Sequence, residues 1–469
     1  MSTLPTTPRG GWDLLVIGGG TAGLLAARTA AGFGASVLLA ERDRTGGDCL
    51  WTGCVPSKAL LAAAGAAASA RTAGRLGVQV GAVEVDFAAV MAHVHGARTS
   101  IEPDDSPSSL EAAGVRVAHA EAQLVGPRTV LVGGQRVEHR QAVVAVGSSP
   151  LVPDLPGLRE VALTSDTVWD LTELPRRLVV LGGGSIGCEL GQAFARLGST
   201  VTVLEAAGRL LSREDPDASA AVADALRADG VTVRTGVGAR AVEGGAVVLD
   251  TGERVEADRV VVAVGRTPRT TGLGLDAGGV QLDERGYVRV DDHLRTTNPR
   301  VWAAGDVTGH PQLTHVAGVH GSLVATNAVL GLRRSTDPVV PRVTFTQPEV
   351  ASVGVTTSDG PTVAHTHVDR AIAEAGTTGF SRLALDRRGR IVGATVVGPR
   401  AGETLGELTL AVRKGLRTRD LAATTHAYPT HSDGAWNAAI ADVRTRLGTP
   451  AAARATRVLT TARRRWLDR

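Results

Sequence analysis

Two stretches of the chain repeat one pattern, and this repeat constrains the fold more than any other feature. Each has an apolar run, three glycines spaced as Gly-x-Gly-x-x-Gly, a run of small residues, and a second apolar run that ends in glutamate. In the first stretch these residues are Gly18, Gly20, Gly23 and Glu41. The first glycine permits a tight turn, the second lets a pyrophosphate approach the backbone, and the third lets a helix pack closely on the strand. The pattern predicts a strand–helix–strand unit that binds a dinucleotide.

The second stretch, RRLVVLGGGSIGCELGQAFARLGSTVTVLE, repeats the pattern with Gly182, Gly184, Gly187 and Glu205. In both stretches the glutamate lies 18 residues beyond the third glycine, where its carboxylate can accept hydrogen bonds from ribose hydroxyls. Two complete units in one chain imply two dinucleotides. We therefore expect FAD together with a nicotinamide nucleotide.

Glu205 bears on which nicotinamide nucleotide is bound. A carboxylate at this position binds a free 2′-hydroxyl group and repels a 2′-phosphate. Arg209 and Arg213 lie close enough in the sequence to weaken this inference. We expect NAD, with NADP as the alternative.

Cys49 and Cys54 form the next strong signal, because the whole chain has only three cysteines. Pro56 is typical of the first turn of a helix, so Cys54 is predicted at or just before a helix N-terminus, which lowers the pKa of a thiol. Cys49 is near enough to close a small disulfide ring, which predicts a two-electron relay. A flavin exchanges electrons with both a hydride donor and a thiol, so we assign FAD to the first unit, next to the cysteines.

The alternatives are a structural cysteine pair or half of a metal site. A metal site needs further ligands, and the chain has no C-x₂-C pair. Histidines do recur at a spacing that some zinc sites use, at His310, His315, His320, His426 and His431. They lie far along the chain from the cysteines, so we expect no metal. Cys188, inside the second glycine stretch, is expected in the core.

Charge and hydropathy argue against two classes of partner. The net charge is only +3, and basic and acidic residues are interspersed, so nucleic-acid binding has little support. No run of about 18 apolar residues and no signal peptide are present, so we expect a cytoplasmic protein without a membrane partner. Three consecutive arginines, 463–465, stand near the C-terminus. We interpret them as a solvated helix end, with contact to an anionic surface as the alternative.

Five further segments carry a resemblance to a known family. They are GGDCLWTGCVPSKAL (46–60), AVVAVGSSP (142–150), VVVAVGRTPRT (260–270), VWAAGDVTG (301–309) and PRVTFTQPEVASVGVT (341–356). With them, the sequence from about Asp13 to about Ile440 resembles the flavin-dependent pyridine nucleotide–disulfide oxidoreductases, which include dihydrolipoamide dehydrogenase and mercuric reductase.

The resemblance implies an α/β fold with two Rossmann-like dinucleotide-binding domains and a C-terminal α+β dimerisation domain. The implied order along the chain is an FAD-binding segment (1–150), a NAD(P)-binding domain (151–268), a second FAD-binding segment (269–340), an interface domain (341–450) and a basic tail (451–469). It also implies a homodimer, because the family builds each active site from both chains.

The resemblance also implies roles for individual residues. Cys54 would be the charge-transfer thiolate beside the flavin, Cys49 the interchange thiol that meets substrate, and Lys58 would pair with Glu189 near the flavin N5. A buried Lys–Glu pair must stay together, because either charge alone is costly. Further implied ligands are Gly47, Gly147 and Asp306 for FAD, and Gly265 and Arg266 for the nicotinamide nucleotide.

One segment departs from the family pattern. Most disulfide reductases of the family carry His-Pro-Thr-x-x-Glu near the C-terminus, whereas this chain has Tyr428 and Asp433 at the His and Glu positions. The usual pKa of tyrosine is about 10 and that of histidine about 6.5, so Tyr428 is a poor general base for a dithiol. The flanking His426 and His431 are possible substitutes, and interface polar residues are the alternative.

The sequence therefore predicts an NAD(P)H-dependent flavoprotein reductase that passes electrons through FAD to the Cys49–Cys54 disulfide. The acceptor would be a small disulfide or a soft metal ion. Mercuric reductase also has tyrosine at that position, but it carries a C-terminal cysteine pair that this chain lacks. One alternative is a dihydrolipoamide dehydrogenase-like dithiol oxidase that reduces NAD. The other is a flavin-bearing scaffold with little turnover.

Overall fold

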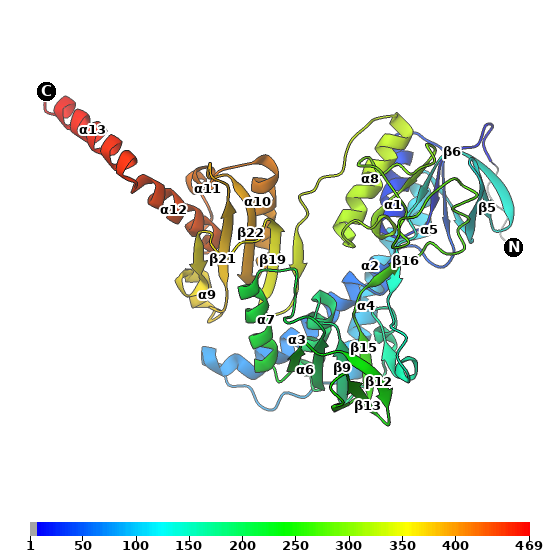
Figure 1. Cartoon of the computed structure of the whole chain (residues 1–469), viewed down its shortest axis with the longest axis horizontal. Coiled ribbons are helices and arrows are strands. Elements are labelled where there is room, and N and C mark those ends of the chain that lie inside the picture. Colours follow the sequence, from blue (N-terminus) through cyan, green and yellow to red (C-terminus); the bar gives the residue numbers. More distant parts are fainter. Residues whose placement is uncertain (1–6) are drawn as a thin grey trace.

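The first repeat builds a mostly parallel sheet that begins the chain (Figure 1). We describe residues 7–469 of a computed structural model, so the first six residues of the expected 1–150 segment lie outside the described range. The strand order is β3 (Val115–His119), β2 (Val37–Glu41), β1 (Trp12–Ile17), β6 (Gln135–Val144), β5 (Thr129–Val132) and β4 (Ala122–Gly126). Leu14, Leu15 and Val16 of β1 are fully buried, as expected for a central strand covered on both faces.

A distant segment completes this sheet. Strand β17 (Val301–Ala303) pairs in parallel with β6, so residues beyond the second repeat return to the first unit. Helix α8 (Thr314–Leu330) follows and packs on α1 (Thr21–Gly32). The packing is close, because a Cβ added at Gly321 would lie 2.3 Å from the carbonyl oxygen of Ala22. This return explains why the sequence shows FAD-type motifs both before and after the second repeat.

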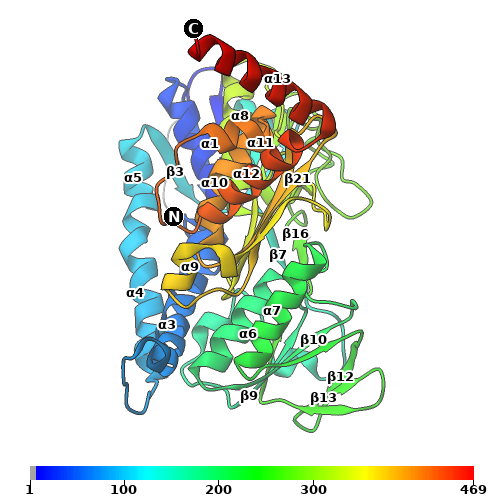
Figure 2. The same ribbon diagram turned by 90° about the vertical axis from the view of Figure 1, so that its left-hand side faces the viewer.

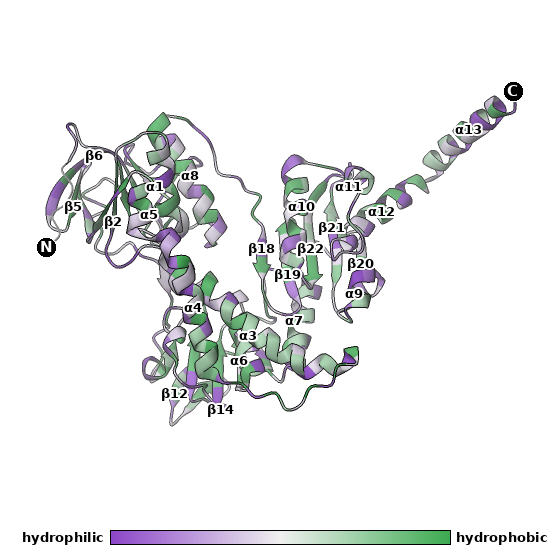
Figure 3. Cartoon of the chain, turned by 180° about the vertical axis from the view of Figure 1, so that it is seen from behind, coloured by the Kyte–Doolittle hydropathy of each residue, from purple (hydrophilic) through white to green (hydrophobic). Residues whose placement is uncertain are grey.

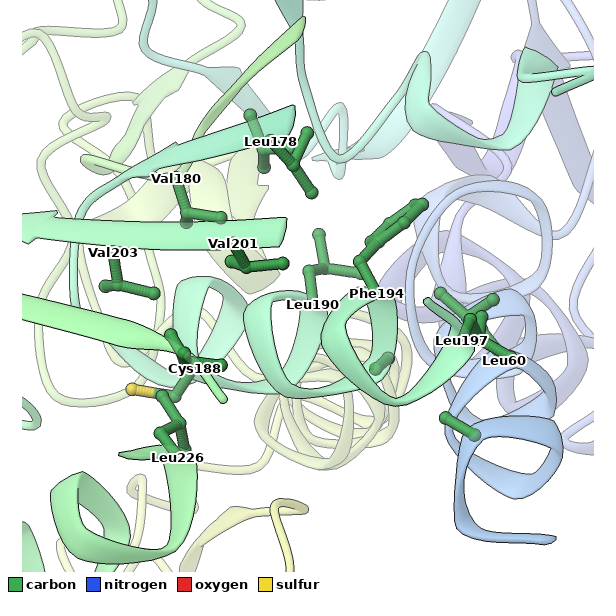
Figure 4. Packing of buried hydrophobic residues seen from close by; sticks show 14 of the residues in the cluster. Leu60, Leu178, Val180, Cys188, Leu190, Phe194, Leu197, Val201, Val203 and Leu226 are labelled. Carbon is green, nitrogen blue, oxygen red and sulfur yellow. The ribbon is translucent and has the colours of Figure 1, made fainter. Parts of the chain in front are cut away.

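The second repeat builds a separate parallel sheet. Its order is β11 (Thr232–Thr235), β10 (Thr200–Glu205), β9 (Arg177–Leu181), β15 (Arg259–Val262) and β8 (Ala162–Leu163). Helices α6 (Ser185–Leu197) and α7 (Pro216–Ala228) pack with it, and a small antiparallel sheet of β12 (Ala239–Glu243), β13 (Ala246–Leu249) and β14 (Arg254–Glu256) lies beside it (Figure 2). Cys188 is fully buried between the sheet and Leu226, as expected (Figure 4).

The C-terminal unit is antiparallel. Its sheet has the order β18 (Arg342–Thr344), β19 (Glu349–Gly354), β22 (Ile391–Gly398), β21 (Phe380–Leu385) and β20 (Thr362–Ala364). The associated helices are α9 (Asp369–Ala373), α10 (Ala401–Lys414), α11 (Thr418–Ala423) and α12 (Asp433–Leu447). Two dinucleotide folds followed by an α+β unit confirm the expected fold class.

Two pairs of elements connect the first unit to its neighbours. Helices α3 (Cys54–Thr72) and α4 (Phe87–Asp105) form a long antiparallel pair, and α3 packs on α6 of the second unit. Short strands β7 (Ser148–Pro150) and β16 (Arg266–Pro268) pair where the chain leaves and re-enters the first unit. One further helix, α13 (Pro450–Leu467), extends beyond the C-terminal unit (Figure 1).

Candidate active site

Cys49 and Cys54 lie on two consecutive helices that meet at a glycine. Cys49 is in α2 (Gly47–Trp51), and Cys54 is the first residue of α3, as its proline pattern predicted. A Cβ at Gly53 would lie 2.8 Å from the carbonyl oxygen of Asp48, so the turn between the helices requires glycine. Both cysteines are free thiols in this structure, and their side chains interact directly.

The two thiols are electrostatically unequal. The hydrogen bond from Cys49, together with the Thr314 hydroxyl and the charge of Lys58, lowers the pKa of Cys54 to about 6. The same hydrogen bond and burial raise the pKa of Cys49. The Oγ1 atom of Thr314, the first residue of α8, lies 3.1 Å from the Cys54 Sγ. The arrangement thus stabilises a thiolate at Cys54, to which the thiol of Cys49 donates a hydrogen bond.

Lys58 and Glu189 meet as the resemblance implied. The Lys58 Nζ lies 2.9 Å from Glu189 Oε2, which joins α3 of the first unit to α6 of the second. The other oxygen of Glu189 accepts a hydrogen bond of 2.9 Å from the backbone N–H of Phe345 in the C-terminal unit. The Lys58 ammonium also lies 4.1 Å from the centre of the Phe345 ring. This pair therefore lies at the meeting point of all three units.

The two glycine fingerprints fit dinucleotides. Helices α1 and α6 begin after Gly20 and Gly184, and no side chain among the described residues caps either N-terminus. Such bare N–H groups are suited to a pyrophosphate. A Cβ at Gly184 would meet no atom within 4 Å, and one at Gly20 would meet only Gly47 Cα, at 3.7 Å. The space beside these glycines is therefore open, so that a phosphate can approach the backbone at each helix N-terminus.

Glu41 and Glu205 have the same surroundings. One carboxylate oxygen of Glu41 accepts a 2.6 Å hydrogen bond from the N–H of Gly19, and one of Glu205 accepts an equal bond from Gly183. Each glutamate is thus the last residue of its strand and is hydrogen-bonded to the glycine turn of its own fingerprint. The arrangement fits two dinucleotides: the first fingerprint, with Glu41, would hold FAD, and the second, with Glu205, would hold the nicotinamide nucleotide.

The arginines near Glu205 occupy different positions. Arg209 donates hydrogen bonds to the backbone carbonyls of Leu211, Ser212 and Glu214. Its guanidinium group is therefore bound to the loop in which Arg209 lies. Arg213 is exposed. With Arg209 held in this way, the carboxylate of Glu205 dominates the local charge, which favours NAD over NADP.

Arg266, which the resemblance assigns with Gly265 to the nicotinamide nucleotide, contacts residues of the first unit. Its guanidinium group forms an ion pair with Asp48 and donates to the Ser148 hydroxyl at 2.6 Å. The hydroxyl of Ser148 donates in turn to Asp306, also at 2.6 Å, and burial raises the pKa of Asp306. Arg266 thus lies close to Asp306, which the resemblance assigns to FAD, and its role toward the nicotinamide nucleotide stays a prediction. Arg269 contacts Asp48 as well, and neither contact was foreseen from the sequence.

Gly147 and Gly265 flank the same junction. Gly147 has a φ of +71°, and a Cβ there would lie 3.6 Å from Arg269, whereas a Cβ at Gly265 would meet nothing within 4 Å. Both roles stay predictions.

Tyr428 and Asp433 have different hydrogen-bond partners. The Tyr428 hydroxyl donates to Asp369 at the start of α9, and this bond raises the pKa of Tyr428. Asp433 accepts instead from the backbone N–H and the hydroxyl of Thr430, at 3.1 and 3.2 Å. Asp369 had no sequence signal, because it lies 59 residues from Tyr428.

The flanking histidines are held inside the C-terminal unit. His426 stacks on Trp436 and lies 3.0 Å from Glu407, while His431 is buried and lies 3.0 Å from Glu374. Their contacts fit the interface-polar interpretation better than the catalytic one. In residues 7–469, no three His, Cys, Asp or Glu side chains are grouped so as to bind a metal ion.

Comparisons with known proteins agree with this geometry. Residues 12–321 match the family model described as pyridine nucleotide-disulphide oxidoreductase. The chain belongs to this family. Residues 340–439 match its dimerisation domain, which supports a homodimer. Members of the family use FAD and NAD(P)H, in agreement with the two fingerprints.

The similar proteins include enzymes of two named activities. A mercuric reductase of Streptomyces lividans is 40% identical over 448 residues, which cover 90% of this chain and 94% of the relative. A dihydrolipoyl dehydrogenase of Geobacillus stearothermophilus is 36% identical over 465 residues, covering 93% and 97%.

Solved structures show the same fold. LpdA of Mycobacterium tuberculosis superposes with a TM-score of 0.84 at 29% identity, covering 91% of this chain and 98% of that one. A Cu(II) complex of the HOCl-induced flavoprotein disulfide reductase RclA of Escherichia coli gives 0.82 at 26% identity, covering 92% and 99%. No helix within residues 7–469 is both long enough and apolar enough to cross a membrane.

Proposed function

We propose that this protein is an NAD(P)H-dependent reductase that passes two electrons to the Cys49–Cys54 pair and on to a soft metal ion or a small disulfide. The observation that carries the proposal is the placement of Cys49 and Cys54 side by side at a helix start between two dinucleotide-binding units, where neighbouring groups lower the pKa of Cys54. Bound FAD would supply the exchange of two electrons between the nicotinamide and the sulfur atoms.

The chain's own residues account for the sulfur chemistry. Above about pH 6, two electrons and one proton convert the Cys49–Cys54 disulfide to a thiol at Cys49 and a thiolate at Cys54. Thr314 and Lys58 stabilise this thiolate, and Cys49 is then the thiol that attacks the acceptor. Re-forming the S–S bond passes two electrons to the acceptor and releases the proton of Cys49, to solvent with a metal acceptor or to the product thiol with a disulfide acceptor.

A soft metal ion is the favoured acceptor. A disulfide acceptor needs an acid to protonate its leaving thiolate, but Tyr428 is bound to Asp369 and its pKa is raised. A soft cation binds thiolates directly and needs no such acid. The mercuric reductase relatives agree with this preference. A homodimer would bring the C-terminal unit of a second chain to each site.

The test is an anaerobic titration of the flavin-loaded protein with NADH and, separately, NADPH, followed by addition of Hg²⁺, Cu²⁺ or a small disulfide. We expect long-wavelength absorbance from a thiolate beside oxidised flavin, lost on addition of the productive acceptor. In Cys49→Ser, transfer to every acceptor should fall to background while reduction by nucleotide persists. Unchanged turnover in that variant would remove the dithiol from the mechanism.

The dihydrolipoyl dehydrogenase relatives favour a second candidate, oxidation of a dithiol with reduction of NAD. Assaying dihydrolipoamide with NAD⁺ at neutral pH separates the two. Turnover with dihydrolipoamide that exceeds every metal or disulfide reduction would replace the first proposal by the second.

A further inference from the structure

We propose that α13 binds the surface of an anionic lipid membrane and attaches the enzyme there as a peripheral protein. The helix runs on from α12, beyond the C-terminal sheet (Figure 3). None of its side chains is buried against any of residues 7–469. It begins at Pro450, past the last residue that the dimerisation-domain model matches, residue 439. It therefore lies outside the segments that the two family models match, and it contains none of the residues of the redox site.

Positive charge is concentrated in this helix and the two residues after it. Residues 450–469 contain six arginines and one aspartate, a net charge of +5, whereas the whole chain has only +3. The rest of the chain therefore carries −2. The arginines are Arg454, Arg457, Arg463, Arg464, Arg465 and Arg469. Such segregation is expected of a segment that meets an anionic surface.

The helix also has one apolar face. At 3.6 residues per turn, the side chains of Val458, Leu459 and Trp466 fall within about 100° of one another around the axis. Their exposed fractions are 62%, 70% and 62%. Ala451, Ala455 and Ala462 fill the same face. In proteins most of the stability of a helix comes from packing of its apolar face, and the exposed apolar face of the 18-residue α13 is suited to an apolar partner.

The arginines are placed at the borders of that face. By the same helical geometry, Arg463 lies on one border and Arg465 on the other. The Arg463 guanidinium group lies 4.1 Å from the centre of the Trp466 ring. Basic residues flanking an apolar face that ends in tryptophan match the boundary between lipid headgroups and acyl chains.

Other occupants fit less well. Two α13 helices of a homodimer, each with a net charge of +5, would repel one another if they packed side by side. Nucleic acid would neutralise the arginines but would leave Val458, Leu459 and Trp466 exposed. An anionic membrane satisfies the charge and the apolar face together.

The experiment is co-sedimentation of the flavin-loaded full chain with vesicles of equimolar phosphatidylglycerol and phosphatidylcholine, read by flavin absorbance in the pellet. We expect binding to these vesicles, none to pure phosphatidylcholine, and release at about 1 M salt, where the Debye length is about 3 Å. Replacing Arg463, Arg464 and Arg465 by Gln should weaken partitioning about 100-fold.

A matched pair of variants tests the apolar face. Leu459→Gln should weaken binding about tenfold, whereas Thr460→Gln, on the opposite side of the helix, should not. Turnover in solution should be the same in all variants. A failure of vesicle binding would therefore contradict the membrane proposal without bearing on the proposed reaction. Absence of vesicle binding by the wild-type chain would overturn the proposal. Equal binding of the two variants would also overturn it. So would a shift from dimer to monomer when residues 449–469 are deleted, because α13 would then be a contact between subunits.

Discussion

Glu189 holds Lys58 with one carboxylate oxygen and the backbone of Phe345 with the other, both at 2.9 Å. These three residues come from three different units of the fold. The side chain of Glu189 is 8% exposed and that of Lys58 is 39% exposed, so the ion pair is only partly shielded from water. This single carboxylate therefore helps to set how the cysteine helix lies against the nucleotide unit and the C-terminal unit.

Replacing Glu189 by Gln should lower the free energy of unfolding by about 1–3 kcal/mol, because it removes one partner of a partly buried charge pair. The value lies below that for fully buried pairs, because Lys58 remains partly hydrated. Chemical denaturation measures the change. Glu256→Gln is the control: its exposed ion pair with Arg177 should contribute almost nothing. Equal effects of the two substitutions would contradict a special role for Glu189.

The thiolate of Cys54 should titrate near pH 6 in the reduced protein, about three units below the usual thiol value of 9.0. Because its pKa is lowered, the thiolate is present above about pH 6 and is lost as the pH falls through that value. Thr314→Val and Lys58→Met should both raise the midpoint, since each removes a group that stabilises the anion. The pH dependence of thiolate absorbance measures it.

Ser57→Ala is the matched control for that titration. The Ser57 hydroxyl donates to the carbonyl oxygen of Cys54, not to its sulfur. Its removal should leave the midpoint unchanged. A midpoint near 9 in the wild-type protein would show that the local groups do not stabilise the thiolate.

Tyr428 should ionise above pH 10, because its hydroxyl donates to Asp369. Asp369→Asn removes the negative charge and should lower that pKa toward 10. The chain has only two tyrosines, so the ultraviolet titration of Tyr428→Phe supplies the trace of the other one for subtraction. An unchanged midpoint in Asp369→Asn would mean that the pair does not form in solution.

Gly23→Ala and Gly187→Ala should each disable one nucleotide unit. In both cases the new Cβ would lie 1.9 Å from the carbonyl oxygen of the first glycine of the same fingerprint. Overpacking of this kind costs about 1–3 kcal/mol or more. Gly23→Ala should lose flavin, whereas Gly187→Ala should keep flavin but lose its reduction by NADH. Absorbance spectra with and without NADH distinguish them.

Gly96→Ala is the control for both, since Gly96 lies in α4 and its added Cβ would meet nothing within 4 Å. Alanine is favoured over glycine inside a helix, so this variant should be as stable as the wild type or more so. Loss of flavin from Gly96→Ala would show that the effect is not specific to the fingerprints.

The sequence alone determined the repeated dinucleotide units, the helix that begins at Cys54 and the buried place of Cys188, because glycine spacing, proline position and apolar runs are local signals. It also placed Lys58 and Glu189 at matching motif positions. Contacts between residues far apart in the sequence could not be predicted from such local signals. Only the tertiary structure shows that Asp369 binds Tyr428, that Arg266 binds Asp48, and that the backbone of Phe345 binds Glu189. Each of these contacts joins residues at least 59 positions apart, and side chains so far separated meet only when packing brings their elements together.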